Sequence, residues 1–217
     1  NAMYLSPHKE SYFQWNPQLF DTLKMLFEEG VDPTWIPEGE KESALFNWFK
    51  GTIPIIMNHR EIANQYKEMT QLILKRHLHY TESGGTVLHG LLKCDWEALP
   101  QKVDKQLSDD FYEIISKILE VNREVFSLCD ENKMNPAHVI MKEICERENA
   151  FQLLLPLIHI PDVSKTKSLT DHIPYNTETC QPIIHEITNP ENVNAQDSLG
   201  RTVLHYLVMA IVKESNV

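Results

Sequence analysis

Apolar residues recur along the chain at the spacing of a helix and are interrupted by short polar stretches. Apolar stripes predict helices from 17 to 29, from about 60 to 79, and through 111–119, with Gly30 ending the first in a left-handed conformation. Near 51–57, Gly51 and Pro54 are expected to break a short helix, and 163–175 is expected to be an extended loop. The pattern predicts an all-α chain.

One tetrapeptide, TVLH, occurs at 86–89 and again at 202–205, each time after a polar turn. Gly200 is free to adopt positive φ in the second turn, and Thr202 is a good helix N-cap. At 135–138, Asn135 and Pro136 predict a third helix start, since asparagine caps well and proline suits the first helical position. Weaker echoes stand at 43–46 and at 182–185, where we expect another helix to open. Letter-for-letter repetition indicates a repeat architecture.

The stretch from Asp197 to His205 resembles the opening of an ankyrin repeat, D-x-x-G-x-T-P-L-H, with Val203 in place of the proline. The stretch 23–33, LKMLFEEGVDP, resembles the end of such a repeat. The resemblance implies an ankyrin-like helical solenoid of about four or five irregular repeats, with short hairpin loops and inserted segments. The repeat positions would be Thr86, His89, Asn135, Pro136, His138, His185, Gly200, Thr202 and His205.

The spacing of these histidines is uneven and departs from the ankyrin period of ~33 residues. We therefore expect a helical, divergent ankyrin-like cap at 3–80, continuous with repeats at 81–217, of which one near 180–195 is collapsed. A mixed helical domain with two genuine repeats is the competing interpretation. Asn1 and Ala2, before Met3, have the look of a cleaved tag.

The net charge limits the classes of partner that the chain can bind, and the cysteines indicate its redox compartment. The formal charge of -11 argues against nucleic acid and anionic membranes, and no apolar run reaches the ~18 residues of a membrane span. The four cysteines are scattered without a C-x-x-C pair, which suits buried thiols in a reducing cytoplasm. We expect a monomer in the cytoplasm.

Four histidines, at 89, 138, 185 and 205, are candidate metal ligands by residue type. Each occupies the same position of a separate repeat, so we expect a structural role instead; the resemblance implies bonds to the threonine hydroxyl and nearby backbone. The chain carries no P-loop, Rossmann glycine pattern, G-x-S-x-G or H-E-x-x-H motif. We expect no enzyme activity, no cofactor and no metal.

The resemblance implies a protein–protein interaction module that binds through hairpin tips and first-helix surfaces. The tips would be 35–40, 83–85, 131–134 and 198–201. Tryptophans there are candidate anchors, although burial beneath inserted segments is the alternative for each. The candidate partner-binding residues are Trp35, Trp48, Lys93, Lys133, Met134, Lys142, Arg201, Tyr206 and Met209.

A second hypothesis has the chain as the targeting domain of a larger enzyme or effector whose catalytic part lies beyond residue 217. Divergent ankyrin-like arrays rich in Asn, Lys and Ile resemble effectors that intracellular bacteria deliver into host cells. This resemblance implies action on host proteins in the host cytosol, and rests on analogy alone.

Overall fold

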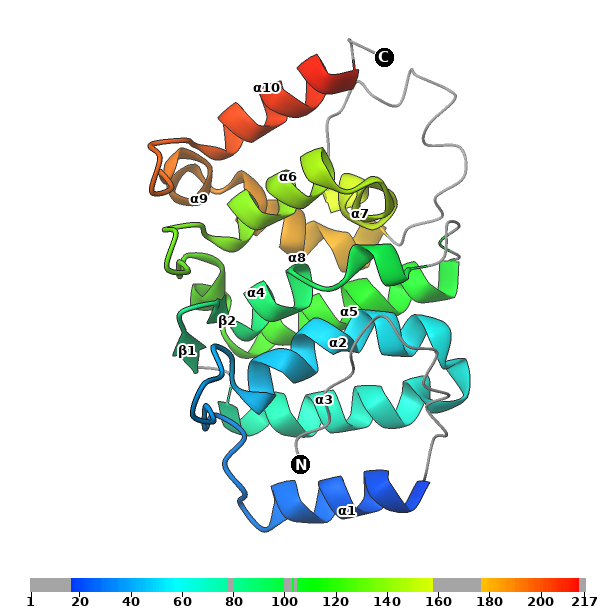
Figure 1. Ribbon diagram of the computed structural model, residues 1–217. Helices are drawn as coiled ribbons and strands as arrows, with labels where there is room; N and C mark the ends of the chain where they lie inside the picture. The colour runs from blue at the N-terminus through cyan, green and yellow to red at the C-terminus, as the bar shows by residue number, and fades with distance from the viewer. Residues whose placement is uncertain (1–16, 78–79, 100–102, 104, 158–176, 215–217) are drawn as a thin grey trace. The chain divides into compact units, whose positions relative to one another are not determined.

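The computed structural model describes residues 17–77, 80–99, 103, 105–157 and 177–214, and the chain divides into two compact units, 1–32 and 33–217. The first unit contains α1 (Pro17–Glu28), drawn in blue in Figure 1. Gly30 has a φ of 88°, and the Val31 amide donates to the Leu26 carbonyl just after the helix. The predicted helix and its glycine end are confirmed. The predicted cap residues before 17 lie outside the described residues.

The second unit is mostly helical, which confirms the all-α prediction at this level. Two antiparallel strands of two residues each, β1 (Thr81–Glu82) and β2 (Gly85–Thr86), form a hairpin just before α4 (Val87–Leu92). The longer helices are α2 (Ala44–Asn58), α3 (Ala63–His77), α4 (Val87–Leu92), α5 (Lys105–Val121), α6 (Pro136–Glu146), α7 (Glu148–Leu154), α8 (Thr177–Thr188) and α10 (Val203–Glu214). Short elements are η1 (Arg60–Ile62), η2 (Trp96–Ala98), η3 (Arg123–Phe126), η4 (Leu155–Leu157) and α9 (Pro190–Asn194).

Helices of the second unit pack in two rows. In the first row α2 packs on α4, α4 on α6, and α6 on α10; in the second row α3 packs on α5 and α5 on α8. Figure 1 shows the first-row helices following one another, with the turns that precede them on the same side of the unit. The amphipathic helix α5 buries Phe111, Ile115 and Ile118 completely or nearly so, and its Tyr112 hydroxyl donates to the Leu153 carbonyl (2.8 Å).

Two helix boundaries differ from the prediction. The helix α2 does not end at Gly51 but continues through Pro54, because Phe49 and Ile53 are fully buried on its core face and their burial offsets the lost hydrogen bond. Pro182 lies inside α8, so the prediction that 182–185 opens a helix is wrong. The expected loop at 163–175 lies outside the described residues, and the expected boundary at 80 between a cap and the repeats stays a prediction.

Candidate interaction surface

The ring of His89 fixes the start of α4. The Thr86 backbone N–H donates to His89 Nδ1 (3.1 Å), and the Thr86 hydroxyl lies 3.0 Å from the same atom. Because a backbone N–H can only donate, Nδ1 is the acceptor and the ring proton is on Nε2. That Nε2–H donates to the Met134 carbonyl (2.9 Å), which lies in the turn before α6.

His138 repeats this link one helix further along the row. Its Nε2 lies 3.2 Å from the Arg201 carbonyl, in the turn before α10, while Nδ1 lies 2.7 Å from Asn135 Oδ1. Met134 and Arg201 each stand immediately before an N-cap residue. The two histidines therefore tie successive first-row helices to the turns that follow them.

The other two expected histidine positions behave differently. His205 receives the Thr202 backbone N–H on Nδ1 (3.1 Å), as His89 does, but its ring is exposed. His185 is exposed on the second-row helix α8, with Nδ1 3.6 Å from Glu186, and it takes no part in this arrangement. The sequence-based assignment of His185 to a repeat position is corrected accordingly, because its helix begins several residues earlier.

A buried carboxylate organises each of the last two tips. Asp130 accepts the backbone N–H groups of Asn132 (2.8 Å) and Met134 (2.9 Å). Asp197 accepts those of Leu199 (2.8 Å) and Arg201 (2.9 Å). The two turns share one hydrogen-bond pattern, although one sequence reads DENKM and the other DSLGR.

Basic and aromatic side chains hold these carboxylates in the charged form. Lys93 Nζ lies 2.7 Å from Asp130, and Arg201 Nε lies 2.8 Å from Asp197. Burial alone would raise the pKa of Asp197, but hydrogen bonds from the Arg201 backbone, the Tyr206 hydroxyl and the Leu199 backbone outweigh it, so the pKa is lowered. Burial also raises the pKa of Asp130, but the hydrogen bond and the charge of the Lys93 ammonium outweigh this effect. The pKa of Asp130 is therefore lowered as well.

Neighbouring tips are joined by backbone hydrogen bonds. The Glu131 N–H donates to the Ser83 carbonyl (3.0 Å), and the Ser198 N–H donates to the Asn132 carbonyl (2.8 Å). Both donors stand four residues before an N-cap, and both acceptors three residues before one. At the first tip the Glu82 carboxylate accepts the Ser43 N–H instead (3.3 Å). The tips thus form a continuous row along one side of the second unit (Figure 1).

The predicted binding residues fall into distinct environments. Trp35 is 68% exposed, Met209 is 52% exposed and Lys133 is exposed at its tip, so all three are accessible. Lys142 is half-buried on α6. Met134 is 5% exposed, because it faces the core beneath its tip.

Four of the predicted residues make contacts within the chain. Tyr206 is buried and donates to Asp197 (2.8 Å), so the prediction that Tyr206 and Met134 offer side chains to a partner is wrong. Arg201 lies over the Tyr206 ring at 4.7 Å as well as pairing with Asp197. Lys93 bonds the Gly84 carbonyl (2.9 Å) in addition to Asp130. Trp48 stacks on Tyr66 at 4.2 Å, and this stacking fixes its ring between α2 and α3.

Sequence reasoning missed the most exposed apolar side chain of the tips. Leu199 is 71% exposed, while its backbone N–H is bonded to Asp197. It also missed the turn-forming role of Asp130. The shared aspartate, five residues before each N-cap at 130 and 197, was the signal that could have found this turn.

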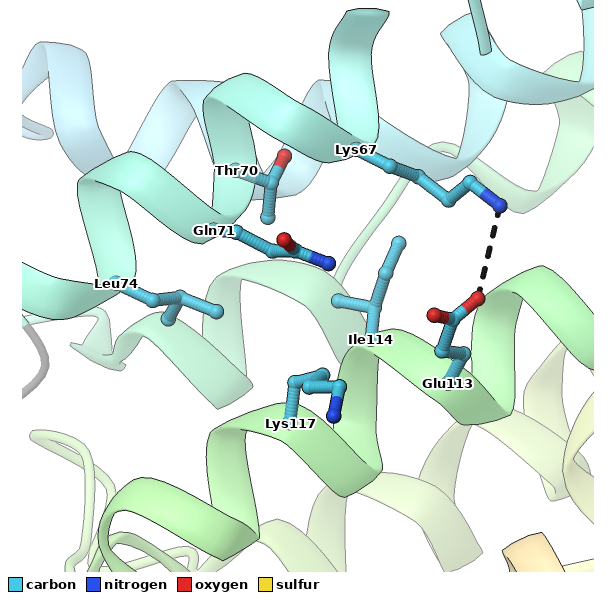
Figure 2. Close-up of a pocket in the computed structure, with 7 residues that line it drawn as sticks. All are labelled: Lys67, Thr70, Gln71, Leu74, Glu113, Ile114 and Lys117. Carbon is cyan, nitrogen blue, oxygen red and sulfur yellow. Dashed lines mark ion pairs between the residues drawn. The ribbon is translucent and has the colours of Figure 1, made fainter. Parts of the chain in front are cut away.

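A shallow hollow between α3 and α5 is the other feature that invites a ligand (Figure 2). It is open to solvent and has a cavity volume of only about 10 Å³, far below the about 300–1,000 Å³ of small-molecule sites. At its rim Lys67 Nζ lies 2.7 Å from Asp110 and 3.6 Å from Glu113. These ion pairs join the two helices, and we assign the hollow a structural role.

Within the residues that the structure describes, no group of three or more His, Cys, Asp or Glu side chains is arranged to hold a metal ion. None of the described helices is both long and apolar enough to cross a membrane. No protein-family model, curated protein or solved structure matches the chain.

Proposed function

We propose that this chain is a protein-interaction module, built of ankyrin-like units stacked as a solenoid, which binds a partner protein along its row of tips. The observation that carries the proposal is that large apolar side chains stand exposed on turns whose backbones are fixed. Leu199 does so on the Asp197 turn, and Trp35 does so on the first tip.

The first tip is also tied down. Its backbone is held by the bond from the Glu40 N–H to the Pro37 carbonyl (3.0 Å), and the adjoining chain by the Tyr80 hydroxyl, which donates to the Thr34 carbonyl (3.0 Å). A preorganised turn loses little conformational entropy on binding, so more of the contact energy appears as affinity. Exposed tryptophans are frequent binding hot spots. The charge of -11 is compatible with a basic surface on the partner.

The repeat interpretation is supported by the recurrence of one set of bonds at successive helices. A histidine three residues after an N-cap reaches the carbonyl just before the next N-cap, at His89 and at His138. An amide four residues before an N-cap reaches the previous tip, at Glu131 and at Ser198. Stacked units of this kind bind partners through extended surfaces. We place the module in the cytoplasm, as a monomer, where free thiols persist.

Binding through the tips is tested by a double variant, Trp35→Ser with Leu199→Ser. Proteins captured from a cell lysate by the wild-type chain are quantified by mass spectrometry after brief cross-linking. We expect capture of the partner to fall about tenfold or more, since each anchor contributes more than 1 kcal/mol. Circular dichroism checks that the fold persists.

The matched control is Val121→Ser, which removes an exposed apolar side chain at the end of α5, outside the tips (57% exposed). It should capture as the wild type does. Equal losses in both variants would show that binding does not use the tips, and no enrichment over empty resin would reject an interaction module.

A further inference from the structure

The last first-row helix, α10, exposes side chains at positions that its predecessors bury. Two residues after the N-cap, Leu88 of α4 and Ala137 of α6 are fully buried, but Leu204 of α10 is 58% exposed. Six residues after the N-cap the same holds: Val208 is 51% exposed, whereas the matching residues, Leu92 and Met141, are buried. At α4 and α6 the next first-row helix packs alongside. The outer face of α10 therefore has the composition of an internal interface.

Two hydrogen-bonding groups lie beside this face, the His205 Nε2–H and the Leu199 carbonyl, and their counterparts in earlier units bond to backbone atoms of the next tip. Thr202 donates to His205 Nδ1, so the proton of His205 is on Nε2, and among the described residues no carbonyl receives it. The Nε2 atoms of His89 and His138 face the backbone carbonyl of the next tip. The Leu199 carbonyl matches those of Ser83 and Asn132 in position, and no described backbone N–H donates to it.

We propose that the outer face of α10, with its tip, docks a polar turn followed by an N-capped helix from a partner protein. The carbonyl just before the partner's N-cap accepts the His205 Nε2–H, and an amide four residues before that N-cap donates to the Leu199 carbonyl. An apolar or aromatic residue four positions after the N-cap packs on the His205 ring. Tyr206, in that position of α10, meets the His138 ring edge-on at 6.1 Å.

The groups that this face can bind are those of a protein backbone, so we take the occupant to be a protein. One donor and one acceptor, spaced as they are between successive tips of this chain, match the carbonyl and the amide of a single peptide turn, and the charge of -11 opposes anionic lipid. The turn-and-helix elements at α6 and α10 of a second copy already pack on the helix before them. The inference rests on the proposed function in taking the partner to be a protein, and it uses the outer face of α10 and the Leu199 carbonyl, not the exposed side chains of the tips.

The probe is the chain's own turn and helix, 193–214, appended to the full chain through a flexible Gly-Ser linker, which supplies a high effective concentration. We expect the appended helix to dock on α10. Its amides should then be protected from hydrogen exchange about tenfold or more, and the His205 Nε2–H signal should become observable by NMR. Unprotected amides and an unchanged His205 signal would overturn the proposal.

The matched variants are Leu204→Asp with Val208→Asp, and Val121→Asp as the control. All three side chains are more than half exposed, so the unextended chain should keep its unfolding midpoint. The first pair should abolish docking and the control should not. Vesicles of phosphatidylcholine with phosphatidylglycerol that bind the chain through Leu204 would also overturn the proposal. The tip variant Trp35→Ser changes a side chain outside α10 and its turn and should leave docking intact, which separates this test from that of the tips.

Discussion

His89 is completely buried and bonded at both ring nitrogens, at Nδ1 by Thr86 and at Nε2 to Met134. Burial lowers its pKa to about 4. An imidazolium would also lose the Thr86 contact, since Nδ1 would become a donor facing another donor. The neutral ring is therefore a structural part of the link between α4 and the next tip.

This lowered pKa predicts an acid-sensitive fold. The folded pKa of His89 lies below the unfolded value of 6.5, so its contribution to stability is fully present above pH 6.5 and is lost as the pH falls toward 4. Urea unfolding at pH 7.5, 5.5 and 4.5 should show a decreasing free energy of unfolding. His138, whose pKa burial also lowers, acts in the same direction.

The control is His89→Gln, which cannot titrate. It should be less stable than the wild type at pH 7.5, because a buried network is broken, by about 1–3 kcal/mol. Its stability should fall less steeply between pH 6.5 and 4.5. A wild-type stability that stays constant across this range would contradict the role assigned to His89.

At the scale of the element, the tips at 131–134 and 198–201 have one backbone shape with different residues. Gly200 has a φ of 74° and the matching Lys133 has a φ of 57°, the only positive φ of a non-glycine residue among those described. The left-handed conformation costs a side-chain-bearing residue roughly 1–2 kcal/mol. The Asp130 bonds to Asn132 and Met134 hold Lys133 there.

Substitution Lys133→Gly should therefore stabilise the chain by about 0.5–1 kcal/mol, after allowing for the greater freedom of glycine in the unfolded state. The reciprocal Gly200→Lys should destabilise by a similar amount, because the space around Gly200 is open and only its φ opposes a side chain. Urea unfolding of both variants measures this. Equal stability of all three chains would contradict the cost assigned to a side chain in the left-handed conformation at these two positions.

Helix starts were predictable where a cap residue announces them. Asn135 accepts the His138 N–H (3.0 Å), and Pro136 occupies the first turn of α6, as local rules indicate. The same rules failed at Pro54 and Pro182, which lie inside α2 and α8. Tertiary burial decided those cases: Ile53 next to Pro54 and Ile183 next to Pro182 are fully buried. The local sequence does not show which residues beside a proline become buried by distant parts of the chain.

At the scale of the whole second unit, the cap-to-histidine spacing predicted equivalent positions for His89 and His138 but not which group each ring contacts. The partners of His89 and His138 are backbone carbonyls far along the chain, at Met134 and Arg201, and no side-chain pattern encodes a carbonyl position. The sequence also did not predict which side chains of α10 are exposed to solvent. Tyr206 and Met209 are three residues apart on α10, yet one is buried and the other exposed.

The central claim is that the tips are joined into one fixed row, and hydrogen exchange of two amides tests it most directly. Glu131 and Ser198 are exposed residues in polar turns, yet their N–H groups donate to the Ser83 and Asn132 carbonyls of neighbouring tips (3.0 and 2.8 Å). We expect both amides to exchange about tenfold or more slowly than unprotected turn amides. Exchange of both at the unprotected rate would mean that the tips move independently and that no row exists.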